Sequence, residues 1–156
     1  MIAAMLYPHL LAFHSLLRWV ALIAGIIAVV VAVSGWSGTK PVSRGLLRSG
    51  IAFVITMDIQ LLVGLILYFA VSPVTHMAFQ NMAAAMKVHE LRFFAVEHTT
   101  YMLLAVILAH VGGVISRKGK TDRSKCRGAG ICYILSVLLM LAGIPWGWRP
   151  LLRFGG

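Results

Sequence analysis

Four long apolar segments constrain this chain more than any other feature of its sequence. Residues 8–34, 46–72, 92–116 and 130–146 contain few charged side chains, and 60% of the 156 residues are hydrophobic while 12% are charged. Charged residues make up about a quarter of an ordinary soluble domain. A helix needs about 20 predominantly apolar residues to cross a bilayer. The sequence therefore predicts one integral membrane domain, an all-α bundle of four spans.

Basic side chains beside these segments predict their orientation. The chain has 14 Lys and Arg against 4 Asp and Glu. Many of the basic residues lie in the connections that follow the first and third spans: Lys40, Arg44, Arg48, Arg117, Lys118, Lys120, Arg123, Lys125 and Arg127. The positive-inside rule places such connections in the cytoplasm, against anionic headgroups. We expect both termini outside and no nucleic-acid partner, because no basic stripe alternates with aromatic residues.

The segment 73–91 between the second and third spans is too polar to cross a membrane. Its apolar side chains recur at near-helical spacing: Met77, Phe79, Met82 and Met86. This spacing predicts a short amphipathic helix on the outer surface, with its Met-rich side packed on the bundle. The alternative is a copper site that includes His76 and His89, because thioether ligands select Cu(I).

Ionisable and amide side chains inside the predicted spans are functional candidates, because they are costly in lipid. They are His14, Arg18, Asp58, Gln60, Glu97, His98 and His110. His14 and His98 each lie about six residues into a span, or about 9 Å below the same face. The first and third spans run in the same direction, so equal offsets mean equal depth. Two imidazoles at one depth can hold one metal centre, and haem b suits them inside an apolar bundle.

Two neighbours of His14 fit this expectation. Arg18 follows it by one turn and is placed to pair with a haem propionate, since a guanidinium binds a carboxylate through two hydrogen bonds. Gly25 falls about 20° from the same helical face and would leave room for a porphyrin edge. The structural alternatives are histidines that hydrogen-bond between helices and an Arg18 paired with Asp58 or Glu97.

Three further residues form a candidate quinone or proton site. Asp58 and Gln60 lie in the middle of the second span, where they can bind a quinone headgroup or relay a proton. Equally, Asp58 can serve as the counter-ion of Arg18, and Gln60 as an interhelical hydrogen-bonding residue. Glu97 points about 100° away from His98 on the helix. Its structural interpretation is a carboxylate that complements the helix dipole, and its alternative is proton exchange at the outer face.

The remaining histidine and cysteines of the spans predict no additional haem. His110 lies about 18 Å beyond His98, and no histidine of another span matches its depth. We therefore expect it to pack against Gly112, Gly113 or a neighbouring helix. Cys126 and Cys132 are not part of a C-x-x-C-H motif, which excludes covalent haem attachment.

Four strings of the sequence carry a resemblance to a known family. They are His-Ser-Leu-Leu-Arg-Trp at 14–19, Ile-Gln-Leu-Leu-Val-Gly-Leu-Ile-Leu-Tyr-Phe at 59–69, Arg-Phe-Phe-Ala-Val-Glu-His at 92–98 and Leu-Ala-Gly-Ile-Pro-Trp at 141–146. In this order they resemble small four-span bacterial membrane proteins labelled cytochrome b or cytochrome b-like. The resemblance implies a haem b protein of a respiratory or photosynthetic inner membrane, with His14 and His98 at the family's histidine motifs. Asp58 departs from it, since the family pattern has a histidine or neutral residue two positions before the glutamine.

These observations lead to one function and two alternatives. The leading interpretation is an electron-transfer subunit with one haem b, which links the quinone pool to a partner redox protein within a larger complex; this role is favoured over that of a stand-alone enzyme, which stays open. A cofactor-free accessory subunit is the first alternative, because glycines at 25, 64 and 112–113 also suit close helix packing. The second is a small transporter or proton channel built on the charged residues of the spans, although the paired broken helices of transporters are lacking.

Overall fold

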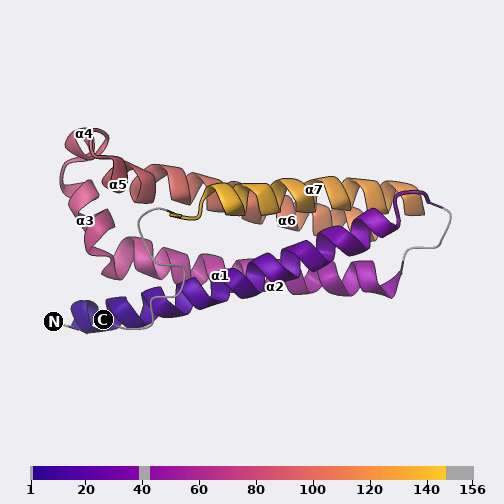
Figure 1. Ribbon diagram of the computed structural model, residues 1–156, viewed down its shortest axis with the longest axis horizontal. Coiled ribbons are helices and arrows are strands. Elements are labelled where there is room, and N and C mark those ends of the chain that lie inside the picture. The colour runs from indigo at the N-terminus through magenta and orange to yellow at the C-terminus, as the bar shows by residue number, and fades with distance from the viewer. Residues whose placement is uncertain (1, 39–42, 147–156) are drawn as a thin grey trace.

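The computed structural model describes residues 2–38 and 43–146, and all regular structure in this part of the chain is helical. Its long helices are α1 (Ile2–Ser34), α2 (Arg44–Ile66), α6 (His98–Lys118) and α7 (Asp122–Ala142). Figure 1 shows them side by side along one axis. The four segments long and apolar enough to cross a membrane are Met5–Ser34, Arg44–Val71, His89–Lys118 and Asp122–Ala142. The predicted all-α bundle of four spans is confirmed.

The packing order of the helices puts α1 and α6 at opposite corners of the bundle. α1 packs on α2 and α7, and α6 packs on the same two helices. Successive long helices run in opposite directions (Figure 1). α1 and α6 are therefore parallel, and side chains at one depth on these two helices can meet in the bundle interior.

The boundaries of two spans differ from the prediction. α7 begins at Asp122, not near residue 130, because Thr121 and Ser124 form a capping box at its start. Each side-chain oxygen accepts a hydrogen bond from the other residue's backbone N–H, at 3.0 and 3.1 Å. α7 ends at Ala142, and α1 begins at Ile2, so Pro8 lies in its second turn and not in its first. Hydrophobicity alone missed the start of α7, because backbone hydrogen bonding continues through its polar first turns. The start of α1 was missed for another reason: residues 2–7 are apolar, but proline suits the first turn of a helix.

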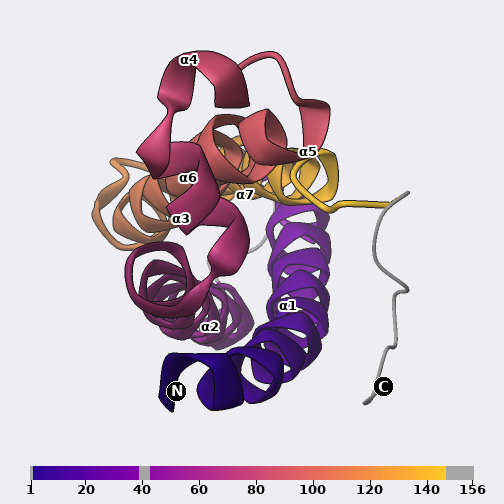
Figure 2. The ribbon, with the colours of Figure 1, turned by 90° about the vertical axis from the view of Figure 1, so that its left-hand side faces the viewer.

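The segment 73–91 forms three short helices, so the prediction of one amphipathic helix is wrong. They are α3 (Pro73–Gln80), α4 (Met82–Ala85) and α5 (His89–Arg92). Asn81 leaves helical geometry at φ −150° and ψ 86°, and its side chain accepts a hydrogen bond from the Ala84 N–H at 3.0 Å, which starts α4. Figure 2 views the end of the bundle where these helices lie. We call them the cap.

The expected packing of the methionine side is also wrong. The cap buries small side chains against the bundle: Thr75, Ala78 and Ala85. Met77, Phe79 and Met82 are 53, 42 and 40% exposed. Met77 and Met82 are therefore exposed, whereas the half-exposed Phe79 ring packs against the rings of Tyr68 and Phe69, with centroids 5.2 and 6.5 Å apart.

Two π-helical segments adjoin the cap. η1 (Leu67–Val71) continues α2, and η2 (Phe93–Glu97) leads into α6. The Tyr68 hydroxyl joins them by donating to the Ala95 carbonyl at 2.7 Å. Such wider turns occur frequently at functional sites. The basic residues at the starts of α2 and α7 and the end of α6 lie at the other end of the bundle (Figure 1).

Small residues let the four spans approach closely around one large side chain. Tyr133 is fully buried, and its ring meets that of Phe53 edge to face at 5.7 Å. A Cβ atom at Gly112 would lie 2.6 Å from the Tyr133 ring, so α6 needs a glycine here. Close approach of this kind stabilises helix pairs in membranes, where lipid competes equally for apolar surface.

A comparison of adjacent glycines tests this packing. We expect Gly112→Ala to lower the free energy of unfolding by about 1–3 kcal/mol, because the added methyl group overpacks the core. Gly113→Ala is the matched control, since the nearest atom to its Cβ would be 3.4 Å away. Unfolding by SDS in mixed micelles measures both variants. Equal stability of the two would contradict the packing described.

Candidate functional site

A cavity of about 140 Å³ lies at the cap end of the bundle. All four spans line it, and most of its lining side chains are apolar. The polar lining residues on the spans include His14, Arg18, Gln60 and His98. Among the described residues, no Asp or Glu lines this bundle cavity. An apolar cavity with a few convergent polar groups is the usual form of a ligand site.

The rings of His14 and His98 meet across this cavity. Their centroids lie 6.3 Å apart, and the ring planes are inclined by 65°. His14 comes from α1 and His98 begins α6, so the pair joins opposite corners of the bundle. The sequence predicted that these two histidines lie at equal depth in their spans, and the structure brings their rings together.

The hydrogen bond of His98 defines its proton position. Nδ1 lies 2.7 Å from the carbonyl oxygen of Gly143, at the end of α7. Because a carbonyl can only accept, Nδ1 carries the proton and the lone pair of the neutral ring lies on Nε2. Metal-binding histidines are oriented by the same kind of bond, which also raises the basicity of the ligating nitrogen.

Gln60 holds the other imidazole. Its amide nitrogen lies 3.1 Å from His14 Nε2 and 3.1 Å from the His14 carbonyl oxygen. The amide nitrogen donates in both contacts, so His14 Nε2 accepts. Gly64 provides space for this ring, since a Cβ atom there would lie 3.2 Å from His14 Cε1. Gln60, expected at a quinone or proton site, is instead the direct neighbour of His14.

Three polar atoms of residues that line the bundle cavity are buried without a hydrogen-bond partner. They are His14 Nδ1, Arg18 Nε and Gln60 Oε1. A buried polar group left unsatisfied costs about 1–3 kcal/mol. Native proteins leave few such groups, so three of them beside one cavity make it a candidate ligand site.

Arg18 brings an uncompensated positive charge to the cavity. Its guanidinium lies 5.3 Å from the centre of the neighbouring Trp19 ring. Within the described part of the chain, no carboxylate forms an ion pair with it, so the alternative pairings with Asp58 and Glu97 are wrong. A guanidinium in apolar surroundings favours an anionic ligand group, and carboxylates fit it best.

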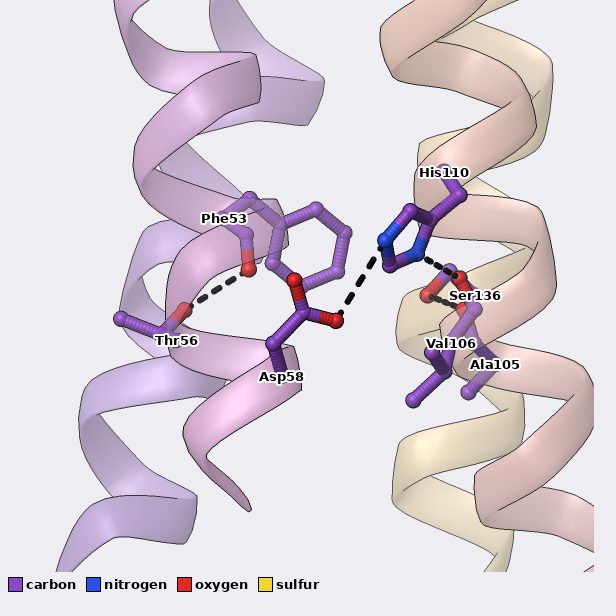
Figure 3. A network of polar contacts seen from close by, with 7 residues as sticks. All are labelled: Phe53, Thr56, Asp58, Ala105, Val106, His110 and Ser136. Carbon is purple, nitrogen blue, oxygen red and sulfur yellow. Dashed lines mark hydrogen bonds and ion pairs between the residues drawn. The ribbon is translucent and has the colours of Figure 1, made fainter. Parts of the chain in front are cut away.

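Asp58 and Glu97 lie outside the bundle cavity. Asp58 Oδ1 is 3.4 Å from Nε2 of His110, whose Nδ1 is 2.9 Å from the Val106 carbonyl (Figure 3). Glu97 accepts a hydrogen bond of 2.7 Å from Arg92. The predicted quinone or proton site of Asp58, Gln60 and Glu97 is therefore not assembled, because each residue meets a different partner.

Gly25 is also remote from the cavity. A Cβ atom there would lie 2.8 Å from both Phe53 Cε2 and Val137 Cγ2. Gly25 thus permits close packing of the helices, and its expected place at a porphyrin edge is wrong. A helical angle alone cannot distinguish room for a ligand from room for a neighbouring side chain.

The sequence reasoning missed Gly143 and the role of Gly64. Gly143 acts on His98 through its backbone carbonyl, which leaves no side-chain pattern to detect. In the sequence, Gly64 indicates only close helix packing. Its spacing of four residues from Gln60 is the signal that places both residues on one face of the helix. Among the described residues, no three His, Cys, Asp or Glu side chains gather as a metal site. Of these four residue types, the described lining of the bundle cavity includes His14 and His98.

Replacing Arg18 distinguishes a ligand site from a structural charge. We expect Arg18→Met to raise the unfolding free energy of the ligand-free protein by about 1–3 kcal/mol, because it removes an unsatisfied buried group. Arg92→Met is the control and should lower stability, since Arg92 pairs with Glu97 and donates to the Met86 carbonyl. SDS unfolding of the purified variants gives both values. Destabilisation by Arg18→Met would assign this arginine to the fold instead.

Comparison of the chain with models of protein families, with curated proteins and with solved structures finds no match. The functional assignment therefore depends on the geometry of the bundle cavity.

Proposed function

We propose that this protein binds one haem b in the bundle cavity, between His14 and His98, and transfers electrons in a bacterial inner membrane. The observation that carries the proposal is the pair of imidazoles from opposite helices, 6.3 Å apart in an apolar cavity. Because two imidazoles from the described residues converge there without a third His, Cys, Asp or Glu, the pair would suit a metal that is already held by a bound organic group, as haem iron is.

The ligand geometry fits this group. Imidazole nitrogen binds transition metals at about 2 Å, so two imidazoles that would share one metal need nitrogens no more than about 4 Å apart. Ring centroids, which lie behind those nitrogens, are further apart, in keeping with the observed 6.3 Å.

The cavity must widen to admit the macrocycle. Its volume of about 140 Å³ is below the roughly 300–1,000 Å³ of common ligand pockets. The Gln60 amide must also move away if His14 Nε2 becomes the ligand. The π-helical segments and the short cap helices at this end of the bundle are the elements we expect to adjust.

Each polar residue of the cavity then has a role. His14 and His98 would hold the iron, and the Gly143 carbonyl fixes the proton on His98 Nδ1 so that Nε2 is available as a ligand. Arg18 would pair with a propionate, and the apolar lining would keep water away. When bound, haem b would supply one-electron transfer.

The position of the site supports a direction for electron exchange. The cavity lies at the cap end, while the basic helix ends lie opposite, which the positive-inside rule assigns to the cytoplasm. We propose that both termini and the cap face outward. A redox partner on this side and quinone in the bilayer are then the electron donor and acceptor, within a respiratory or photosynthetic complex.

A pyridine haemochrome assay of the purified protein tests the proposal. We expect about one haem b per chain, and loss of most of it in His14→Ala and His98→Ala. His110→Ala is the matched control, since His110 lies in α6 but outside the cavity, and it should keep its haem. Circular dichroism verifies that each variant is folded.

The opposite result would favour the accessory-subunit alternative. A colourless, folded wild-type protein obtained from cells supplied with haem precursor would contradict the proposal. Full haem content in both cavity variants would contradict the assignment of ligands.

A further inference from the structure

Asp58 and His110 form a polar pair on the outside of the bundle. Asp58 lies halfway along its span, Arg44–Val71, and His110 lies within the span His89–Lys118. Their side chains are 46 and 47% exposed. Figure 3 shows them reaching toward each other from α2 and α6. Ionisable groups at this depth almost always face protein or water and not lipid, so this pair requires a cover.

The residues around the pair repeat one pattern on both helices. On α2 they are Ile51, Ile55, Asp58 and Leu62, and on α6 they are Leu103, Ile107, His110 and Val114. Both sets have spacings of four, three and four residues, with the polar residue third. We call these eight residues the α2–α6 flank.

The α2–α6 flank has the form of a helix-packing seam. Its apolar members are 42 to 62% exposed. Spacings of three and four residues are those of coiled-coil seams, and one polar residue within such a seam fixes register and partner number. Membrane helices pack through similar seams and use polar side chains to associate.

We propose that this chain forms a symmetric dimer through the α2–α6 flank, in which Asp58 of each copy meets His110 of the other. The argument for a second copy is charge complementarity. A twofold axis along the membrane normal preserves depth and exchanges the two sides of the flank. It therefore sets α2 of one copy against α6 of the other, so each carboxylate faces an imidazole.

The pair that the dimer exchanges is separate from the haem site, because neither Asp58 nor His110 lines the bundle cavity; of the eight flank residues, only Leu103 does. In the dimer, each Asp58 carboxylate would lie beside two His110 imidazoles, one from its own chain and one from the other copy. Loss of the dimer and loss of haem are therefore separately measurable.

Two complementary variants test the pairing across the interface. Full-length Asp58→Ala and His110→Ala proteins carry different fluorophores and are reconstituted in bilayers of fixed composition. Neither variant has the pair within its own chain, so any recovery in a mixture must come from contact between copies. Dimerisation is followed by energy transfer as the protein-to-lipid ratio is varied.

We expect each variant alone to dimerise about tenfold more weakly than the wild type, since membrane polar contacts contribute modestly and two are lost. In the mixture one pair is restored, so heterodimers should be about threefold tighter than either homodimer. Val30→Ala, on the exposed side of α1, should dimerise like the wild type. Circular dichroism and haem content identify any variant that fails to fold.

Several outcomes would overturn the proposal. A wild-type chain that stays monomeric at high protein-to-lipid ratio would show that another protein covers the flank. Heterodimers no tighter than homodimers would show that the pair acts within one chain. If Asp58→Ala and His110→Ala fail to fold, Ile107→Trp provides the second test, and undiminished dimerisation of that variant would contradict the interface.

Discussion

The high cost of an unpaired polar group in hydrocarbon governs the whole structure. Most polar side chains within the spans meet this cost by bonding to a backbone carbonyl of their own or a neighbouring helix. Ser136 donates to the Ala105 carbonyl at 2.7 Å, and Tyr68 donates to that of Ala95. Three of the five buried side-chain atoms that have no partner among the described residues belong to residues lining the bundle cavity. On the α2–α6 flank, Asp58 and His110 are paired but half-exposed in the middle of their spans. Both places are therefore where we infer that another molecule completes the protein.

The two places differ in kind. The bundle cavity combines imidazoles with an unpaired guanidinium and buried orphan atoms, a set that suits a metal-containing anion. The α2–α6 flank is polar only at its centre and otherwise apolar, a composition that suits a protein surface. The core between them is closely packed by glycine and alanine around Tyr133 and Phe53. Asp58 and His110 lie outside the bundle cavity, and Leu103 is the flank residue that also lines it.

The features that depend only on position along the chain could be predicted from the sequence. Span number follows from apolar length, and the meeting of His14 and His98 follows from counting residues along two parallel helices. The contacts of individual side chains could not be predicted, because they depend on which residues of other helices lie nearby. Gly25 faces Phe53, Arg18 lacks the carboxylates that instead pair with His110 and Arg92, and the cap methionines point outward. The Gly143 carbonyl could not be predicted, because backbone groups carry no sequence signature.

Electron paramagnetic resonance of the purified, oxidised protein is the sharpest test of haem binding between His14 and His98, because the signal reports the ligands of the iron. We expect a low-spin ferric signal typical of two imidazole ligands, replaced by a high-spin signal when either His14 or His98 is changed to glycine and restored by added imidazole. A wild-type signal that is high-spin, or that is unchanged in both glycine variants, would contradict it.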